Sequence, residues 1–203
     1  MTAFLIALLG SYLLGSFPTG FLLVKWLKRV DLRTVGSGNI GATNVGRVAG
    51  RWASALVFVL DAAKGCLPVV IAPSLTGSLP PTSGLACGLA AVLGHNFPVF
   101  LNFKGGKGVA TTIGVLLAAA PTVGIIYLTV WGAGLLIWRY VSVSSMAAAA
   151  SIPITLLILH RAPAEILLGL ALALLIVLRH RANIDRLRRG TEPRIGAPQN
   201  ISR

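Results

Sequence analysis

Residues 1–24, MTAFLIALLGSYLLGSFPTGFLLV, carry no charged side chain, and Lys25, Lys28 and Arg29 follow directly. A helix of about 20 apolar residues is long enough to cross the hydrocarbon layer of a membrane. The stretch lacks the basic start and the A-x-A cleavage signal of a secretory signal peptide, so we expect an uncleaved first membrane helix. Because basic residues mark the cytoplasmic side, the N-terminus is predicted outside and residue 25 inside.

The composition also indicates an integral membrane protein. Of the 203 residues, 55% are hydrophobic and only 11% are charged, whereas soluble domains carry roughly 25% charged residues. A net charge of +13 would suggest nucleic-acid binding in a soluble protein. Here most cations lie in the polar gaps between apolar segments, where membrane topology explains them, so no nucleic-acid partner is expected.

Seven apolar segments can be drawn, and we predict an all-α polytopic membrane protein with about seven transmembrane helices. They lie at about 3–24, 52–72, 83–97, 108–120, 122–138, 142–160 and 163–180. An alternative with five helices merges 108–138 and 142–180. Pro121 and the Arg161-Ala162-Pro163 corner favour seven, because proline interrupts a helix.

The basic residues set the predicted orientation. The gaps between segments alternate between many and few Lys and Arg, which places the C-terminus in the cytoplasm whether seven or five helices are counted. We expect residues 1–193 to form a single integral-membrane domain. Residues 194–203 are predicted to form a flexible cytoplasmic tail.

The first unusual polar stretch is GSGNIGATNVGR at 36–47. Its four glycines allow tight turns and a close approach of the backbone to a ligand. Ser37 and the neighbouring polar residues offer hydrogen-bond donors, and the planar guanidinium of Arg47 suits a phosphate or carboxylate. A flexible loop with capping residues has a similar composition and remains the alternative.

The second stretch is LNFKGGKGVATT at 101–112. Its glycines expose backbone N–H groups, a helix is predicted to begin near Val109, and two lysines add positive charge, so the stretch predicts an anion site. It is not a Walker A loop, because Lys107 is followed by Gly108. No acidic cluster accompanies it, so we expect neither a metal nor a cofactor. An ordinary basic cytoplasmic loop is the alternative. His95, just before it, is either a general base or a structural histidine.

The third stretch is RHRANIDRLRRGTE at 179–192. A basic amphipathic helix on the membrane surface explains its arginines, but it explains Asn183 and Glu192 less well. His180 and Asp185 have the H-x4-D spacing of a well-known acyltransferase dyad, in which the aspartate orients a histidine base. One such match is common by chance in 203 residues, and nothing else of that family surrounds it.

Charged residues inside the apolar segments are expected to be paired, because an isolated charge is costly in a membrane. Asp61 and Lys64 are spaced i, i+3 on one helix and can form an ion pair. Glu165 lies at the predicted outer end of the last segment, next to Arg161, and is interpreted as structural.

The three stretches together resemble the bacterial acyl-phosphate:glycerol-3-phosphate acyltransferases, the PlsY family. LLGSFPTG at 13–20 and DAAKG at 61–65 are similar to that family as well. The resemblance covers most of the chain in order and spacing. It implies a seven-helix enzyme of the bacterial inner membrane with its active site facing the cytoplasm. Such an enzyme transfers a fatty acyl group from acyl phosphate to the 1-hydroxyl of sn-glycerol 3-phosphate, which yields lysophosphatidic acid and phosphate in the first acylation of phospholipid synthesis.

The resemblance also implies roles for particular residues. Those implied for glycerol 3-phosphate are Ser37, Asn39, Thr43, Asn44, Arg47 and Lys104. Those implied for the phosphate group of acyl phosphate are Gly105, Gly106, Lys107, Gly108, Val109, Ala110 and Thr111, with Lys104 at the start of the same loop. The catalytic candidates are His95, from its place beside the loop, and His180, Asn183 and Glu192, from the resemblance. Asp185 falls where that family tolerates many residues.

The residues agree with this chemistry. Acyl phosphate is an activated mixed anhydride, so no protein nucleophile and no covalent acyl-enzyme are required, and basic glycine-rich loops suit two anions and a polarised carbonyl. The base is either a histidine, His95 or His180, or a substrate phosphate. The fatty chain is expected between helices in contact with lipid, and the enzyme that produces acyl phosphate is expected nearby. A transporter of phosphate esters is the alternative. It is less favoured because no repeat is visible and the polar stretches lie on one face.

Overall fold

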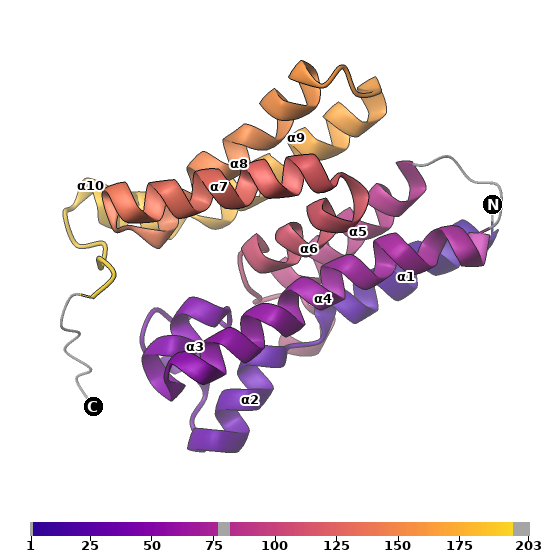
Figure 1. The fold of residues 1–203 in the computed structure, drawn as a ribbon. Helices are drawn as coiled ribbons and strands as arrows, with labels where there is room; N and C mark the ends of the chain where they lie inside the picture. The colour runs from indigo at the N-terminus through magenta and orange to yellow at the C-terminus, as the bar shows by residue number, and fades with distance from the viewer. Residues whose placement is uncertain (1, 77–81, 197–203) are drawn as a thin grey trace. The chain divides into compact units, whose positions relative to one another are not determined.

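The computed structural model describes residues 2–76 and 82–196, which form helices joined by short connections (Figure 1). The chain divides into two compact units, Met1–Ala119 and Ala120–Arg203. Each unit has its own helix packing, and each is described by itself. The all-helical prediction is confirmed for the described residues.

The first unit is built around a long helix, α4, which packs against α1, α5 and α6, while α1 also packs along α5. Its helices are α1 (Thr2–Ser16), α2 (Thr19–Lys28), α3 (Ala42–Ala49), α4 (Arg51–Thr76), α5 (Thr82–Asn96) and α6 (Val109–Ala119), with 3-10 turns η1 (Leu32–Thr34) and η2 (Val99–Leu101). A small apolar core under α2 and α3 contains Val24, Leu32, Val45 and Val57. This core holds the 36–47 stretch against the membrane helices.

Glycines set the closest helix contacts in this unit. A Cβ atom on Gly15 or Gly94 would collide with the facing backbone of α5 or α1, and one on Gly65 or Gly114 would collide with the facing backbone of α6 or α4. Small residues let membrane helices approach closely and gain van der Waals contact. The glycines of the apolar segments therefore allow α1 to pack closely on α5, and the start of α6 to pack closely on the middle of α4.

The predicted first membrane segment over about 3–24 is confirmed as one span candidate, Thr2–Lys28, but its helix is interrupted in the middle. α1 ends at Ser16 and α2 begins at Thr19, so the helix is interrupted at Phe17 and Pro18. Proline has no backbone N–H to donate and its ring clashes with the preceding turn, which accounts for the break. The interruption places polar groups inside an otherwise apolar span.

The second unit is formed by α7 (Pro121–Trp138), α8 (Val141–Ile158), α9 (Pro163–Arg179) and α10 (Arg181–Arg188), with α8 packed against both α7 and α9. Pro121 and Pro163 are the first residues of α7 and α9, a position where the missing N–H costs nothing. The merged helices of the five-helix alternative are therefore not observed, because α6 and α7, and α8 and α9, are separate helices. At the start of α9, the predicted contact between Arg161 and Glu165 is confirmed at 2.7 Å.

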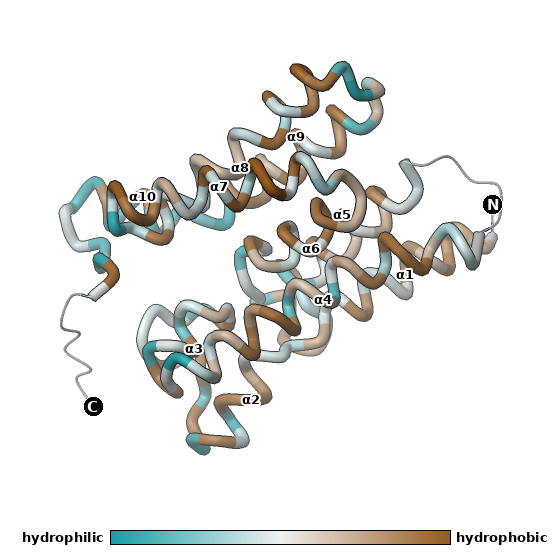
Figure 2. The backbone as a smooth tube through the Cα atoms, viewed as in Figure 1, coloured by the Kyte–Doolittle hydropathy of each residue, from teal (hydrophilic) through white to brown (hydrophobic). Residues whose placement is uncertain are grey.

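All seven predicted apolar segments are helical, and hydrophobic residues predominate along them (Figure 2). Among the described residues, five segments are long and apolar enough to cross a membrane when α1 and α2 are counted together as Thr2–Lys28. The pair α9 and α10, bent by 51° at their junction, adds a sixth if the two helices form one span. The remaining segment, α6, has only 11 residues. The chain is thus a multi-pass membrane protein with five to six clear span candidates, and the predicted count of seven includes the short α6.

The first residues of the predicted tail make contacts with the second unit. The N–H of Ile195 donates to the carbonyl of Arg139 at 2.8 Å, and Nε of Arg194 lies 3.0 Å from the hydroxyl of Tyr140. These contacts tie residues 194–196 to the end of α7. The rest of the predicted tail, from residue 197, lies outside the described residues.

Candidate active site

The 36–47 stretch is held in shape by Asn44, which is buried at the start of α3. The side-chain oxygen of Asn44 accepts from the N–H of Ser37 at 2.8 Å, and its amide nitrogen lies 2.9–3.3 Å from the carbonyls of Leu32, Val35 and Asn39. One side chain therefore satisfies four backbone groups of a loop that lacks the regular hydrogen bonds of a helix or sheet. Asn44 is a part of the loop's framework.

The same loop has two glycines in the left-handed region, where other residues are strained. Gly36 has φ +60° and Gly38 has φ +69°. The side chain of Asn39 accepts from the N–H of Gly41 at 2.9 Å and closes a tight turn just before α3. Ser37 and Thr43 are exposed on this frame. Asn39 and Asn44 thus shape the loop, while Ser37 and Thr43 face outward from it.

The entry to this loop carries an exposed ion pair between Asp31 and Arg33, with 2.6 Å between Nη2 and Oδ2. Hydrogen bonds from Arg33 lower the pKa of Asp31 to about 2. The carboxylate therefore stays ionised, and it neutralises Arg33 locally. Arg47 is half-buried in the last turn of α3, at the end of the 36–47 stretch.

The glycine loop at 104–108 lies directly on the end of α5. The N–H of Gly106 donates to the carbonyl of His95 at 3.0 Å. A Cβ atom on Gly106 would collide with Nε2 of the His95 ring, and one on Gly105 would collide with the His95 carbonyl and with Pro98. Both glycines are therefore required for packing against His95.

This contact refines the predicted role of the glycines. The sequence predicted that they expose N–H groups to an anion, but the N–H of Gly106 is already used by His95. Gly108, with φ +79°, turns the chain into α6, and a Cβ there would lie 2.9 Å from the Asn96 side chain. Lys104 is exposed and Lys107 is half-buried on either side of the glycine pair. The loop thus brings His95 and two cations to one place.

Polar atoms are buried beneath this loop. Among the described residues, the amide atoms of Asn96 and the hydroxyls of Thr111 and Thr112 have no hydrogen-bond partner although they are fully buried. Buried polar groups are normally satisfied by protein, water or ligand. Such atoms next to the start of α6 indicate a polar interior at this end of the first unit.

A buried ionic cluster joins the same end of α5 to α4 and α2. Nζ of Lys64 lies 2.7 Å from Oδ1 of Asp61, which confirms the predicted pair. The sequence did not predict the other members: the hydroxyl of Thr19 donates to Asp61 at 2.5 Å, and Nδ1 of His95 lies 3.7 Å from the same carboxylate oxygen. The short match at 13–20 contains Thr19, and it is the signal that could have found that member.

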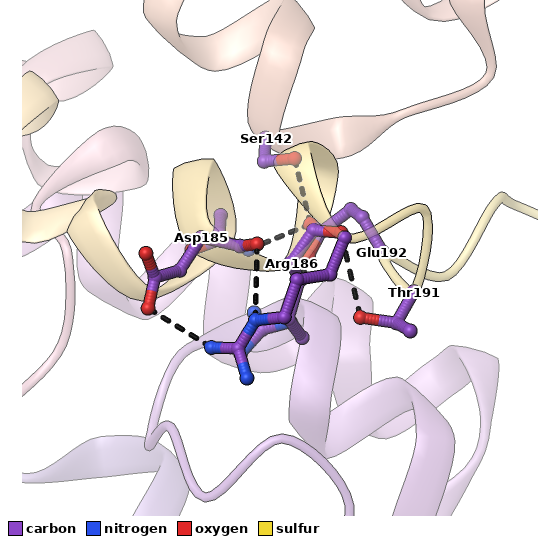
Figure 3. Close-up of polar contacts among 7 residues, drawn as sticks. Ser142, Asp185, Arg186, Thr191 and Glu192 are labelled. Atoms are coloured by element: carbon purple, nitrogen blue, oxygen red, sulfur yellow. Dashed lines mark hydrogen bonds and ion pairs between the residues drawn. The ribbon is translucent and has the colours of Figure 1, made fainter.

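In the second unit, Glu192 ties the segment after α10 to α8 (Figure 3). Its Oε1 accepts from Ser142 and from Asn183, each at 2.6 Å, and its Oε2 accepts from Arg186 at 2.8 Å. Burial raises the pKa of Glu192, but the hydrogen bonds from Ser142, Asn183 and Arg186 outweigh it and leave the pKa below its ordinary value. Both carboxylate oxygens are therefore engaged, and Ser142 is a member of the tie that sequence reasoning missed.

The geometry does not support the H-x4-D dyad. Nδ1 of the buried His180 lies 2.7 Å from the carbonyl of Ile176. The Asp185 side chain is 62% exposed and pairs with Arg189 at 3.0 Å. An orienting aspartate would have to face the buried histidine, whereas this one faces solvent and an arginine.

The predicted site residues thus gather into separate groups. In the first unit, Asn39 joins Asn44, and His95 joins Gly105 and Gly106. In the second unit, Asn183 joins Glu192, and His180 begins α10. Within residues 2–76 and 82–196, no three His, Cys, Asp or Glu side chains are grouped so that they could hold a metal ion.

The fold and these groups define a multi-pass integral membrane protein with its polar chemistry at helix ends and in glycine-rich basic loops. Comparison with known proteins gives the family. The family model described as glycerol-3-phosphate acyltransferase matches residues 5–190. The chain belongs to the glycerol-3-phosphate acyltransferase family.

Similar proteins match over nearly the full length. A glycerol-3-phosphate acyltransferase of Geotalea daltonii is 47% identical over 192 residues, which cover 95% of this chain and 97% of that protein. One from Synechococcus elongatus is 46% identical, with 98% and 97% covered. Among solved structures, PlsY (YgiH), an integral membrane glycerol 3-phosphate acyltransferase, matches in its glycerol 3-phosphate form with TM-score 0.88, 44% identity and 97% and 96% coverage. Its lysophosphatidic acid form matches with TM-score 0.85 and 43% identity, again with 97% and 96% coverage.

Proposed function

We propose that this protein transfers a fatty acyl group from acyl phosphate to the 1-hydroxyl of sn-glycerol 3-phosphate. The observation that carries the proposal is the match over 97% of the chain to a membrane glycerol 3-phosphate acyltransferase. That enzyme has been solved in a glycerol 3-phosphate form and in a lysophosphatidic acid form. The glycine loop on His95, flanked by Lys104 and Lys107, agrees with a substrate that carries a phosphate. The use of acyl phosphate as the acyl donor goes beyond what the names of the similar proteins state.

The reaction needs little covalent help from the protein. The hydroxyl oxygen of glycerol 3-phosphate attacks the acyl carbonyl carbon, and the bond from that carbon to the phosphate oxygen breaks. The products are lysophosphatidic acid and inorganic phosphate, and the hydroxyl proton passes to a histidine or to the phosphate that leaves. The leaving group is already activated, so positioning and charge stabilisation supply the catalysis.

Glycerol 3-phosphate is assigned to the 36–47 loop. Arg47 supplies a planar, bidentate donor for its phosphate, and Ser37 and Thr43 supply hydroxyls on the exposed side. The hydrogen bonds of Asn39 and Asn44 support the view that these two act by holding the loop. Lys104 adds a further positive charge.

The phosphate group of acyl phosphate is assigned to the loop at 105–111. Lys107 and the N-terminal end of α6 provide positive charge, and Gly105, Gly106 and Gly108 allow the loop to lie against α5. Val109, Ala110 and Thr111 form the first turn of that helix. His95 is proposed to act at the reacting groups next to this loop.

His180 and Asn183 are proposed for the reaction from their positions in the third motif. Glu192 is proposed as a positioning residue, because its two oxygens are taken up by Ser142, Asn183 and Arg186. In this role it holds the amide of Asn183 in place.

The protein is proposed to lie in the bacterial cytoplasmic membrane with its polar loops facing the cytoplasm. The alternation of Lys and Arg between the apolar segments supports this orientation. Acyl phosphate hydrolyses readily in water because it is a mixed anhydride, so an enzyme that makes it is proposed to act close by.

The test uses the purified protein in detergent with sn-glycerol 3-phosphate and, in parallel, palmitoyl phosphate or palmitoyl-CoA. Phosphate release and lysophosphatidic acid are followed. Turnover with acyl phosphate alone is the expected result. Turnover with the CoA ester alone would overturn the donor assignment, and turnover with neither would lead to an uptake assay for phosphate esters in liposomes.

A further inference from the structure

The buried cluster around Asp61 connects the two ring nitrogens of His95 to different surroundings. Nδ1 lies 3.7 Å from Oδ1 of Asp61, while Nε2 points at Gly106, where an added Cβ atom would collide with it. The ring therefore lies between a carboxylate on α4 and the glycine loop. His95 and Asp61 are 4% and 1% exposed, so water does not screen their interaction.

The carboxylate of Asp61 is fixed from two other sides. Lys64 pairs with it at 2.7 Å, and the hydroxyl of Thr19 donates to it at 2.5 Å. Nζ of Lys64 also donates to the carbonyl of Phe17 at 3.0 Å, which lies at the break between α1 and α2. A buried ion pair rarely adds net stability by itself. The arrangement does, however, fix the Asp61 carboxylate in one position beside the His95 ring.

We infer that Asp61 is a positioning residue for His95: its carboxylate, fixed by Lys64 and Thr19, holds the ring proton on Nδ1 and presents Nε2 to the glycine loop. Which ring nitrogen carries the proton is set by the partner of the other, and a carboxylate favours N–H on the side that it faces. A movement of under about 1 Å brings Nδ1 to hydrogen-bond distance. The expected effect of Asp61 on catalysis rests on the proposed function, whereas its expected effect on the tautomer of the His95 ring does not.

The main variant is Asp61→Leu with Lys64→Met. Removing Asp61 alone would leave a buried lysine unpaired, and the protein would be destabilised for that reason. Replacing both charges with apolar residues of similar size is often neutral, so the double variant removes the carboxylate while allowing folding. Thr19→Val removes only the hydroxyl, and Thr19→Ser restores it. Asp185→Asn, which removes an exposed carboxylate from α10, is the matched control.

The first readout is ¹⁵N NMR of histidine side chains in the full-length protein in detergent. The chain has three histidines, and His95→Gln identifies the signals of His95. We expect Nδ1 of neutral His95 to be protonated in the wild type and in Asp185→Asn, and the proton to be distributed between both nitrogens in the double variant. An unprotonated Nδ1 in the wild type, or the same tautomer in the double variant, would overturn the inference. This readout needs no turnover, so it is independent of the proposed function.

The second readout is the separation of kcat from KM. If Asp61 orients a group that acts on the reacting atoms, kcat should fall about 10- to 100-fold in the double variant while KM for both substrates changes less than about 3-fold. Thr19→Val should cause a smaller fall in kcat, and Thr19→Ser should restore it. A higher KM together with a lower stability, at unchanged kcat, would assign Asp61 to structure alone. Absence of turnover in the wild type would instead contradict the proposed function.

Discussion

Gly106 shows how a motif residue serves packing as well as binding. Its hydrogen atom faces the His95 ring, and its N–H donates to the His95 carbonyl. The glycine therefore fixes the distance between the basic loop and the histidine. Any larger residue would push the loop away from α5, and the two lysines would move with it.

The first prediction concerns this contact. Gly106→Ala should lower the free energy of unfolding by about 1–3 kcal/mol, because an added Cβ overpacks a closed site, and it should also lower kcat/KM. Thermal unfolding and acyl transfer in detergent measure the two effects. Gly132→Ala on α7 is the control, since nothing lies within 4 Å of a Cβ there. A Gly106→Ala protein as stable and active as the control would contradict the packing role.

The second prediction concerns Arg47. Arg47→Ala should raise KM for glycerol 3-phosphate by about 10- to 100-fold, the range expected for the loss of a charge-assisted hydrogen bond. Arg47→Lys should recover only part of the loss, because lysine lacks the planar fork. Steady-state kinetics in detergent give both values, with Arg51→Ala, an exposed arginine at the start of α4, as the control. An unchanged KM in Arg47→Ala would remove Arg47 from the substrate site.

Helix α10 depends on contacts from elsewhere in the chain. It has only eight residues, and such a short helix is marginal without tertiary contacts. Glu192 supplies them by joining Ser142 on α8 to Asn183 and Arg186 on α10. The tie therefore orients the helix that carries Asn183.

The third prediction uses the lowered pKa of Glu192. A carboxyl with a lower pKa in the folded state binds fewer protons when folded, so its stabilisation is complete above the unfolded pKa and is lost as the pH falls through the folded pKa. At neutral pH, Glu192→Gln should lower the free energy of unfolding by about 2 kcal/mol, so the variant should unfold at a lower temperature than the wild type. The difference should shrink once the pH falls below the ordinary glutamate value of 4.5.

Thermal unfolding of both proteins from neutral to acidic pH provides the measurement. Asp185→Asn is again a suitable control, because its exposed pair with Arg189 contributes little. A gap between wild type and Glu192→Gln that stays constant into acid would mean that the charge of Glu192 is not what stabilises the tie.

The distribution of cations along the chain predicts how it crosses the membrane. The net charge is +13, and the Lys and Arg lie mainly in alternate gaps between the apolar helices. The fourth prediction follows from this pattern. With Cys66 and Cys87 replaced by alanine, a cysteine at Ser37 or Arg188 should react with a membrane-impermeant thiol reagent in inside-out vesicles. A cysteine at Ala164 should react in intact cells.

All three positions are exposed in the structure, so the side of the membrane should decide the labelling. Reaction of positions 37 and 188 from opposite sides would contradict the proposed orientation. Reaction of position 164 from the cytoplasmic side would do so as well.

Local sequence features were sufficient to predict the positions of most helices, one buried ion pair and the family. Apolar segments and prolines located the helices, because the length of an apolar run and the missing N–H of proline act within a few residues. The i, i+3 spacing of Asp61 and Lys64 correctly predicted their pair, since both lie on one helix face. The motifs at 36–47, 94–111 and 179–192 correctly indicated the family.

Other features depend on helix packing and were not visible in the sequence. The break at Pro18 was missed because it lies inside an uncharged stretch, residues 1–24, that is long enough to be interpreted as one span. The approach of His95 to Asp61 and Gly106, and the bond from Ser142 to Glu192, join residues that lie far apart in the chain or meet across different elements. Such contacts arise where glycine crossings and buried hydrogen bonds bring helices together, and no spacing along one segment encodes the partner on another.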